Sequence, residues 1–209
     1  MRARTVGTLL VITCIHLSGF SAFADQFRGL ESALSVCTEL PATADVVSKR
    51  LAEGGWAADA KAVWATFNSG AFAYNLNPDD IAYSLDNGSF MAASILGNSA
   101  MPPYQPGFSI SDTKLSVLMS DTVQAYCVIS GNLPLFNELA AKVSFTETLS
   151  SAVHRRLEGQ LAAHSIIIVV LDRAKLEPII SASKPQYVKP QDFVFDEVNV
   201  FVMSAKKEE

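Results

Sequence analysis

The sequence predicts an α+β domain, in which an antiparallel or mixed β-sheet carries helices packed mainly on one face. Three observations predict this class. Apolar residues recur at helical spacing through the first half of the chain, they alternate along the second half, and the two patterns do not follow a regular β-α-β order. The chain has 209 residues, of which 49% are hydrophobic and 18% are charged. It is therefore too apolar for a disordered protein and long enough to bury a core. We expect a single globular domain over residues 25–209, with a helix-rich N-terminal half.

Residues 1–24 have the pattern of a secretory signal peptide. Arg2 and Arg4 form a basic start, residues 6–15 are an uncharged and mainly apolar run, and residues 22–24 read Ala-Phe-Ala before Asp25. A basic region, an apolar region and a small-residue cleavage site follow one another in the order that export requires. We therefore expect cleavage before Asp25 and a mature protein that is periplasmic or extracellular.

Two other interpretations of this segment are weaker. An uncleaved membrane anchor needs about 20 predominantly apolar residues, and Gly7, His16 and Ser18 interrupt the run. A lipid anchor at Cys14 would normally have a smaller residue than Thr13 before it and a polar segment after it. No later stretch is apolar for long enough to span a bilayer, so we expect no stable membrane insertion after cleavage.

The charge of the chain excludes some classes of partner. The formal net charge is −5 at pH 7, and removal of the two arginines of residues 1–24 leaves 14 basic against 21 acidic residues. Nucleic-acid binding needs clustered positive charge, which this acidic chain does not offer. The expected partner is therefore a small ligand or another protein of the cell envelope.

The mature chain would keep two cysteines, Cys37 and Cys127, and we expect them to form a disulfide. Leu30, Leu34 and Cys37 recur at spacings of three and four, which places Cys37 on the apolar face of a helix. Cys127 shares the parity of the apolar residues in an alternating segment, so its side chain faces the core as well. Two buried free thiols are the alternative. The absence of a C-x-x-C sequence argues against a redox-active pair.

The first half contains start and stop signals for helices. We predict one helix over residues 25–39 and another that opens at Thr43 or Ala44 and ends at Gly54-Gly55. Residues 57–76 are ambiguous, and we favour short strands at 63–67 and 71–76 around the turn-forming sequence Asn68-Ser69-Gly70. Asn77-Pro78 should open a helix that ends at Asn87-Gly88. Residues 90–96 fit a short helix or strand, and the proline-rich residues 101–107 fit a loop.

The second half contains the strand signals. Alternation at 115–119 and 123–129 around Ser120-Asp121 predicts a β-hairpin, and residues 134–143 fit a helix. Residues 149, 153, 157 and 161 are all Leu or Val, and this spacing of four favours a helix over 146–163. The apolar run 166–171 fits a central strand covered on both faces. Prolines at 178, 185 and 190 indicate a long connection before a last strand near 198–202, with a turn or bulge at Asp196-Glu197.

The common catalytic and cofactor motifs are absent from the sequence. It contains no phosphate-binding G-x-x-x-x-G-K-[ST], no G-x-G-x-x-G, no G-x-S-x-G, no H-E-x-x-H and no EF-hand loop, so we expect no cofactor and no metal. Beyond residue 24 the only histidines are His154 and His164. On a helix His154 and Glu158 would share one face, but two ligands are too few for a zinc site, so we interpret them as a solvated pair.

We predict an exported, soluble, non-catalytic binding protein. Aromatic side chains are the best candidates for ligand contact, because they offer large apolar surfaces and Tyr and Trp also carry a polar group. The candidates are Trp56, Trp64, Tyr74, Tyr83 and Tyr104. The alternative is a hydrolase of the cell envelope with an unfamiliar site, in which His154 or His164 acts as the base and Glu158 is the nearest carboxylate in sequence.

Overall fold

The computed structural model describes residues 29–39, 43–97, 107–118 and 126–204. The predicted signal peptide, Tyr104, most of the proline-rich loop and the hairpin turn at 120–121 lie outside these ranges. The described elements are a helix over residues 29–38, α2 (Ala44–Glu53), β1 (Ala57–Ala58), α3 (Ala60–Tyr74), α4 (Ile81–Gly97), β2 (Gly107–Ile110), β3 (Thr113–Leu118), β4 (Tyr126–Gly131), α5 (Leu133–Ala140), β5 (Phe145–Ser150), β6 (His154–Leu161), β7 (His164–Leu171), α6 (Arg173–Ala182), the 3₁₀ turn η1 (Pro190–Asp192) and β8 (Val198–Ser204).

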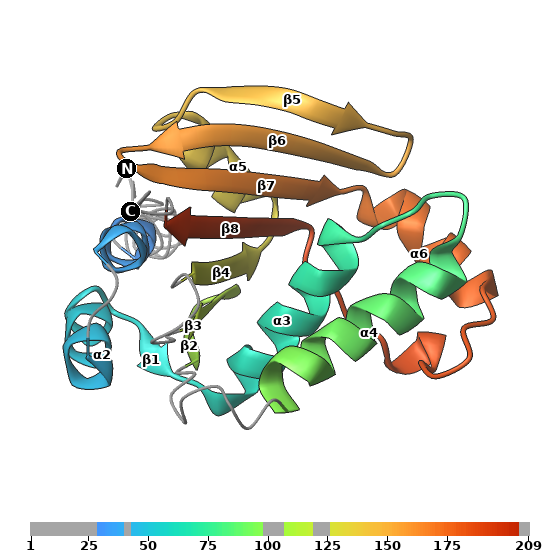
Figure 1. Ribbon diagram of the computed structural model, residues 1–209, viewed down its shortest axis with the longest axis horizontal. Coiled ribbons are helices and arrows are strands. Elements are labelled where there is room, and N and C mark those ends of the chain that lie inside the picture. Colours follow the sequence, from blue (N-terminus) through green and yellow to red (C-terminus); the bar gives the residue numbers. More distant parts are fainter. Residues whose placement is uncertain (1–28, 40–42, 98–106, 119–125, 205–209) are drawn as a thin grey trace, which may run out of the picture.

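The strands form one antiparallel sheet in the order β1-β2-β3-β4-β8-β7-β6-β5. This arrangement confirms the predicted α+β class, and β3 and β4 form the predicted hairpin. Figure 1 shows β8, the last described strand, in the middle of the sheet, between β4 and β7. The sheet is therefore two antiparallel groups, β1–β4 and β5–β7, that are joined through β8.

Helices cover both faces of the sheet, whereas the sequence predicted helices mainly on one face. The helix over 29–38, α2 and α5 pack on one face, against side chains such as Ile129, Ile166 and Val200. The helices α3, α4 and α6 pack on the other face, against Ile167, Val169 and their neighbours. The reason lies in the central strands, where consecutive residues are apolar, so that both faces must be covered. The prediction of a two-sided strand at 166–171 is confirmed by this packing.

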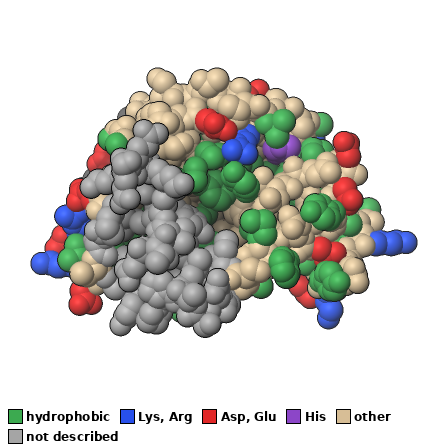
Figure 2. Space-filling view, viewed as in Figure 1, with side chains coloured by type: hydrophobic (Ala, Val, Ile, Leu, Met, Phe, Trp, Pro, Cys, Tyr) green, Lys and Arg blue, Asp and Glu red, His purple; other side chains and the backbone are tan. Residues whose placement is uncertain are grey.

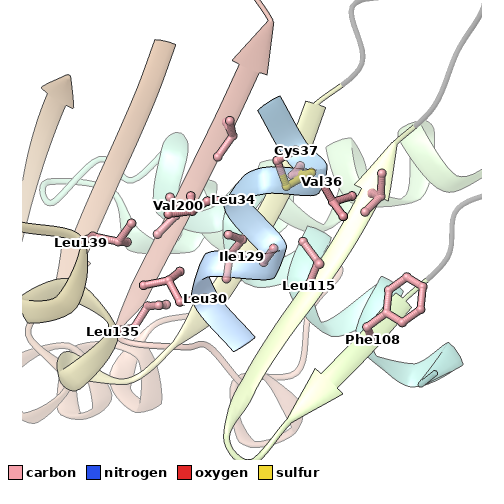
Figure 3. Packing of buried hydrophobic residues seen from close by; sticks show 14 of the residues in the cluster. Leu30, Leu34, Val36, Cys37, Phe108, Leu115, Ile129, Leu135, Leu139 and Val200 are labelled. Carbon is pink, nitrogen blue, oxygen red and sulfur yellow. A yellow bond between two sulfur atoms is a disulfide. The ribbon is translucent and has the colours of Figure 1, made fainter. Parts of the chain in front are cut away.

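The predicted disulfide between Cys37 and Cys127 is present. The two sulfur atoms are 2.06 Å apart, and the Cα atoms are 5.7 Å apart. Figure 3 shows Leu30, Leu34 and Cys37 on the face of their helix that points to the sheet, close to Leu115, Ile129 and Val200. Both cysteines are at most 1% exposed, so the bridge anchors this helix inside the core rather than at the surface.

Residues 57–76 form mainly a helix, so the strands predicted at 63–67 and 71–76 are wrong. Asp59 caps α3 by accepting a hydrogen bond from the backbone N–H of Lys61. The residues that suggested a turn lie in the middle of α3, where Asn68 accepts from Ser89 of α4 and the next two residues face the sheet. The hydroxyl of Ser69 donates to Asn199, and Gly70 lies so close to the sheet that a Cβ would be 3.1 Å from Val128. These small residues allow the helix to pack closely against the sheet. Turns are rich in the same residue types, so the sequence alone did not discriminate between the two.

The helix α4 continues through Asn87-Gly88, where the sequence predicted its end. At its start, the side chain of Asp80 accepts from the N–H of Tyr83, while Asn77 accepts from the N–H of Asp79. Gly88 is a contact point instead of a terminator, because a Cβ there would lie 2.8 Å from the Cα of Phe72 in α3. This glycine lets the backbones of α3 and α4 approach closely.

The helix predicted over 146–163 is instead the hairpin of β5 and β6. A spacing of four residues keeps side chains on one face of a strand as well as of a helix, so the pattern did not discriminate between the two. The helix α6 lies where the sequence predicted only a long connection. Its start is capped by Asp172, which accepts from the N–H of Lys175, and Pro178 lies inside it.

Glu138 on α5 is a buried carboxyl group. It is 5% exposed, and neither of its oxygen atoms has a hydrogen-bond partner among the residues that the structure describes. Burial raises its pKa above the ordinary value, and the positive charge of Lys142 opposes this change only in part. Lys142 itself is 2.6 Å from Glu31 of the N-terminal helix.

Glu138→Gln should therefore raise the free energy of unfolding at neutral pH, by about 1–3 kcal/mol. The folded pKa lies above the unfolded one, so the stabilisation by protonated Glu138 is complete below the unfolded pKa and is lost as the pH rises through the folded pKa. Urea unfolding from about pH 4 to pH 8 should show a smaller loss of stability for Glu138→Gln than for the wild type. The exposed Glu53→Gln is the control, and parallel pH curves for all three proteins would contradict the prediction.

Candidate functional site

A pocket of about 470 Å³ lies at the end of the sheet where β7 leads into α6. Four segments far apart in sequence form it: the turn between β5 and β6, the end of β7 with the first turn of α6, the start of α5, and the residue before β8. Figure 1 shows the β5–β6 turn and the start of α6 at the same end of the sheet. The lining residues are Leu133, Ser151, Ala152, Val153, His154, Arg155, Val170, Leu171, Asp172, Arg173, Ala174, Lys175 and Glu197.

Hydrogen bonds fix the walls of this pocket. The Ser151 N–H donates to the carbonyl of His154 at 2.9 Å, and the Ser151 Oγ accepts from the N–H of Val153 at 3.2 Å and of His154 at 3.1 Å. The turn is tied to α6, because the Asp172 N–H donates to the carbonyl of Val153 at 2.8 Å. Lys175 Nζ adds a bond of 3.1 Å to the carbonyl of Ala152. The pocket is therefore preformed by the backbone.

His154 belongs to this pocket, but it is part of a strand rather than of the predicted solvated helix. It is 5% exposed, and burial lowers the pKa of its imidazole, so the ring is neutral at neutral pH. Its Nδ1 lies 2.8 Å from the Oγ of Ser151. That Oγ already accepts two backbone N–H groups, and it can donate its own proton to Nδ1 or to the carbonyl of His154 at 3.4 Å.

The other residues of the catalytic hypothesis lie elsewhere. His164 opens β7 opposite Leu161 and Ser204, whereas His154 pairs with Leu171 at the far end of the same strand. The Nδ1 of His164 is buried and has no hydrogen-bond partner within the described ranges. Glu158 is four residues from His154 along β6, which is about 13 Å at the rise of a strand. It accepts from Arg156 at 3.1 Å instead, so the structure does not assemble these three residues.

The predicted aromatic candidates do not converge on the pocket. Trp56 is buried, and its indole N–H donates to the carbonyl of Gly29 at 2.8 Å, so it anchors the N-terminal helix. Trp64 and Tyr83 are exposed on α3 and α4, and Tyr104 lies outside the described ranges. Only Tyr74 joins a polar cluster.

Tyr74 and Glu158 both contact the guanidinium of Arg156. The guanidinium of Arg156 lies 4.7 Å from the ring centroid of Tyr74, and the same guanidinium bonds to Glu158. The Tyr74 ring is also 5.5 Å from Phe201 on β8. Figure 2 shows hydrophobic and charged side chains gathered beside a histidine on this face of the molecule. This cluster has the form of a cation–π contact that secures α3 to the sheet.

Sequence reasoning missed most of the lining residues. Among them, Asp172 had a recognisable signal, because an Asp that follows an apolar strand and precedes Arg-Ala-Lys-Leu is a typical helix cap. Ser151, Arg155 and Arg173 had none, since their role depends on which segments the sheet brings together. In the part of the chain that the structure describes, no three His, Cys, Asp or Glu side chains form a metal-binding group. No described helix has the length and apolarity to cross a membrane.

Comparisons with protein-family models, with curated proteins and with solved structures found no match to this chain. The function is therefore inferred from the chemistry of the site.

Proposed function

We propose that this protein is an exported, non-catalytic binding protein, and that the pocket at the β5–β6 turn holds a small ligand. The observation that carries the proposal is a preformed pocket of about 470 Å³ whose walls are fixed by backbone hydrogen bonds. Ligand sites commonly measure about 300–1,000 Å³ and are largely built before the ligand arrives. A rigid wall favours binding, because less conformational entropy is lost when the ligand is ordered.

Two observations support export. Residues 1–24 have the charge, apolar run and small-residue site of a signal peptide. The Cys37–Cys127 disulfide is of the kind that persists in oxidising compartments such as the periplasm or the extracellular space.

The geometry of Ser151 supports a non-catalytic role. A serine nucleophile needs a free Oγ beside a base that a third group orients. The Oγ of Ser151 instead accepts two backbone N–H groups and closes a turn. Among the described residues, the His154 ring donates no hydrogen bond to a carboxylate. The Ser151–His154 contact is therefore explained as part of the wall.

Mass spectrometry of the protein purified from its native host tests the proposal. Under denaturing conditions we expect a chain that begins at Asp25 and is lighter by two hydrogen atoms before reduction. Under native conditions we expect additional mass from a bound ligand. Ala174→Trp should abolish this extra mass, because Ala174 is an exposed residue of α6 that lines the pocket. Ala182→Trp on the same helix lies outside this lining and should retain it. An uncleaved chain would contradict export, and extra mass that survives Ala174→Trp would contradict the site.

The hydrolase alternative rests on one observation, the 2.8 Å contact between Ser151 Oγ and His154 Nδ1. We expect no turnover of p-nitrophenyl esters above the buffer rate. Turnover that both Ser151→Ala and His154→Ala remove, with Ala182→Trp retaining it, would establish the hydrolase and overturn the non-catalytic proposal.

A further inference from the structure

From the distribution of charge in the pocket, and resting on the proposed function, we infer the class of its ligand. The pocket selects a small amphiphile with an apolar body and a single anionic head such as a carboxylate, and Arg155 is the residue that recognises the charge. The inference combines the apolar wall, the pairing of the lining charges and the exposure of one ion pair.

The apolar part of the lining can hold a hydrocarbon body. Val153 and Leu171 are buried in the core on the α6 side of the sheet, and the partly buried Val170 packs against the core on the opposite face. Leu133, the first residue of α5, is 46% exposed at the pocket. A large apolar side chain that remains exposed at the rim of a pocket offers surface that an apolar ligand can remove from water.

Two of the three cationic side chains in the lining are balanced by carboxylates that also belong to it. Lys175 Nζ is 2.6 Å from Asp172. Arg173 Nε is 3.8 Å from Glu197, its Nη1 donates to Glu177 at 3.1 Å, and its Nη2 donates to the carbonyl of Phe195. The donor groups of Arg173 and Lys175 are therefore occupied by partners within the protein.

Arg155 is the cation of the lining whose donor groups are least occupied. Its Nε is 2.6 Å from Glu147 on β5, a residue outside the lining. The two side chains of this pair are 50% and 39% exposed, and an exposed ion pair contributes at most about 1 kcal/mol. The Nη groups of Arg155 have no hydrogen-bond partner among the residues that the structure describes, so they remain available to a carboxylate in the geometry that guanidinium favours.

The pairing of the charged groups in the lining also disfavours other classes of ligand. A cationic head would find no free acceptor, because both lining carboxylates already have partners. A dianion would bring a second charge for which the lining offers no unpaired cation. An uncharged amphiphile would fill the apolar wall but would gain nothing from Arg155.

Three probes with the same eight-carbon chain test the inference, namely octanoate, octanol and octylammonium, each added to the disulfide-bonded chain from Asp25 onward. We expect octanoate to bind more tightly than the other two by NMR titration, and Ala174→Trp to abolish its binding. Arg155→Gln should weaken octanoate by about tenfold and leave octanol unchanged. Glu147→Gln is the matched control, because it breaks the same ion pair but keeps the arginine charge, and it should retain or improve octanoate binding.

The outcomes separate the inference from the proposed function. Equal binding of octanoate and octanol with no effect of Arg155→Gln would overturn the ligand class, while the pocket would remain a binding site. Absence of binding by all three probes would also overturn the ligand class. In that case the native-host mass that is sensitive to Ala174→Trp decides whether the proposed function stands.

Discussion

Replacement of both Cys37 and Cys127 by alanine should lower the free energy of unfolding by about 4 kcal/mol. The bridge joins residues that are 90 positions apart, so its loss greatly increases the conformational freedom of the unfolded chain. The double variant avoids leaving one unpaired thiol, and alanine avoids burying a hydroxyl group at two sites that are at most 1% exposed. Urea unfolding of the oxidised wild type and of the variant measures the difference.

Reduction of the wild type provides the control for this experiment. The reduced wild type should lose nearly as much stability as the double variant, because the covalent link is the main property removed in both. A loss below about 1 kcal/mol would contradict the prediction, since removal of a native disulfide typically costs at least about 2 kcal/mol. A circular dichroism spectrum of the folded variant that matches the spectrum of the wild type would show that the remaining core still specifies the fold.

Asp196→Asn should lower the free energy of unfolding by about 2–4 kcal/mol, the second-largest effect that we expect. The carboxylate accepts from Lys114 Nζ at 2.9 and 3.0 Å and from Ser130 Oγ at 2.7 Å. Its backbone N–H donates to Ser69 at 2.8 Å, and its carbonyl accepts from Asn199 at 3.0 Å. One residue thereby connects β3, β4, α3 and β8.

The size of the effect follows from the burial of the partners. The carboxylate side chain of Asp196 is 15% exposed and that of Lys114 is 30% exposed, and Ser130 is fully buried, so water replaces their lost interactions only in part. An amide can still accept from Ser130, but it no longer balances the Lys114 ammonium. The control Asp192→Asn makes the same change at an exposed position and should alter stability by less than about 0.5 kcal/mol. Equal stabilities of the two variants in urea would contradict a structural role for the network.

Local patterns predicted those elements whose surroundings leave little choice. The run at 166–171 is apolar at both parities, which only a strand covered on two faces accommodates, and Thr43 and Gly54-Gly55 bound α2 as expected. The pairing of Cys37 with Cys127 followed from two inward-facing side chains. In each of these cases one physical requirement dominated the sequence.

The wrong predictions of secondary structure concern sequence patterns that are compatible with two structures. Ser69 and Gly70 have the composition of a turn, yet they allow α3 to lie close to the sheet. The spacing of four from Leu149 to Leu161 suits a strand as well as a helix. The sequence did not reveal which helices cover each face, because that depends on how distant segments pack.

Only part of the candidate site was predicted, because it too depends on how distant segments pack. His154 was named in advance, but as a solvated partner of Glu158 on a helix, whereas it forms the wall of a pocket. The aromatic candidates were selected by residue type, and Trp56 proved to be a core anchor. The pocket itself joins residues 133, 151–155 and 170–175, and only the antiparallel order of the strands brings these segments together.

The central position of β8 determines when this chain can fold. Until Val198–Ser204 is available, β4 and β7 have no common neighbour, and each presents an unpaired inner edge to solvent. The sheet is therefore completed by contacts between residues far apart in sequence, which form slowly because they require large loops to close. For a protein that we propose is exported, this delay has a use. A translocating chain must remain extended, and this sheet cannot be completed until β8, which follows β1 to β7 in the sequence, has been synthesised.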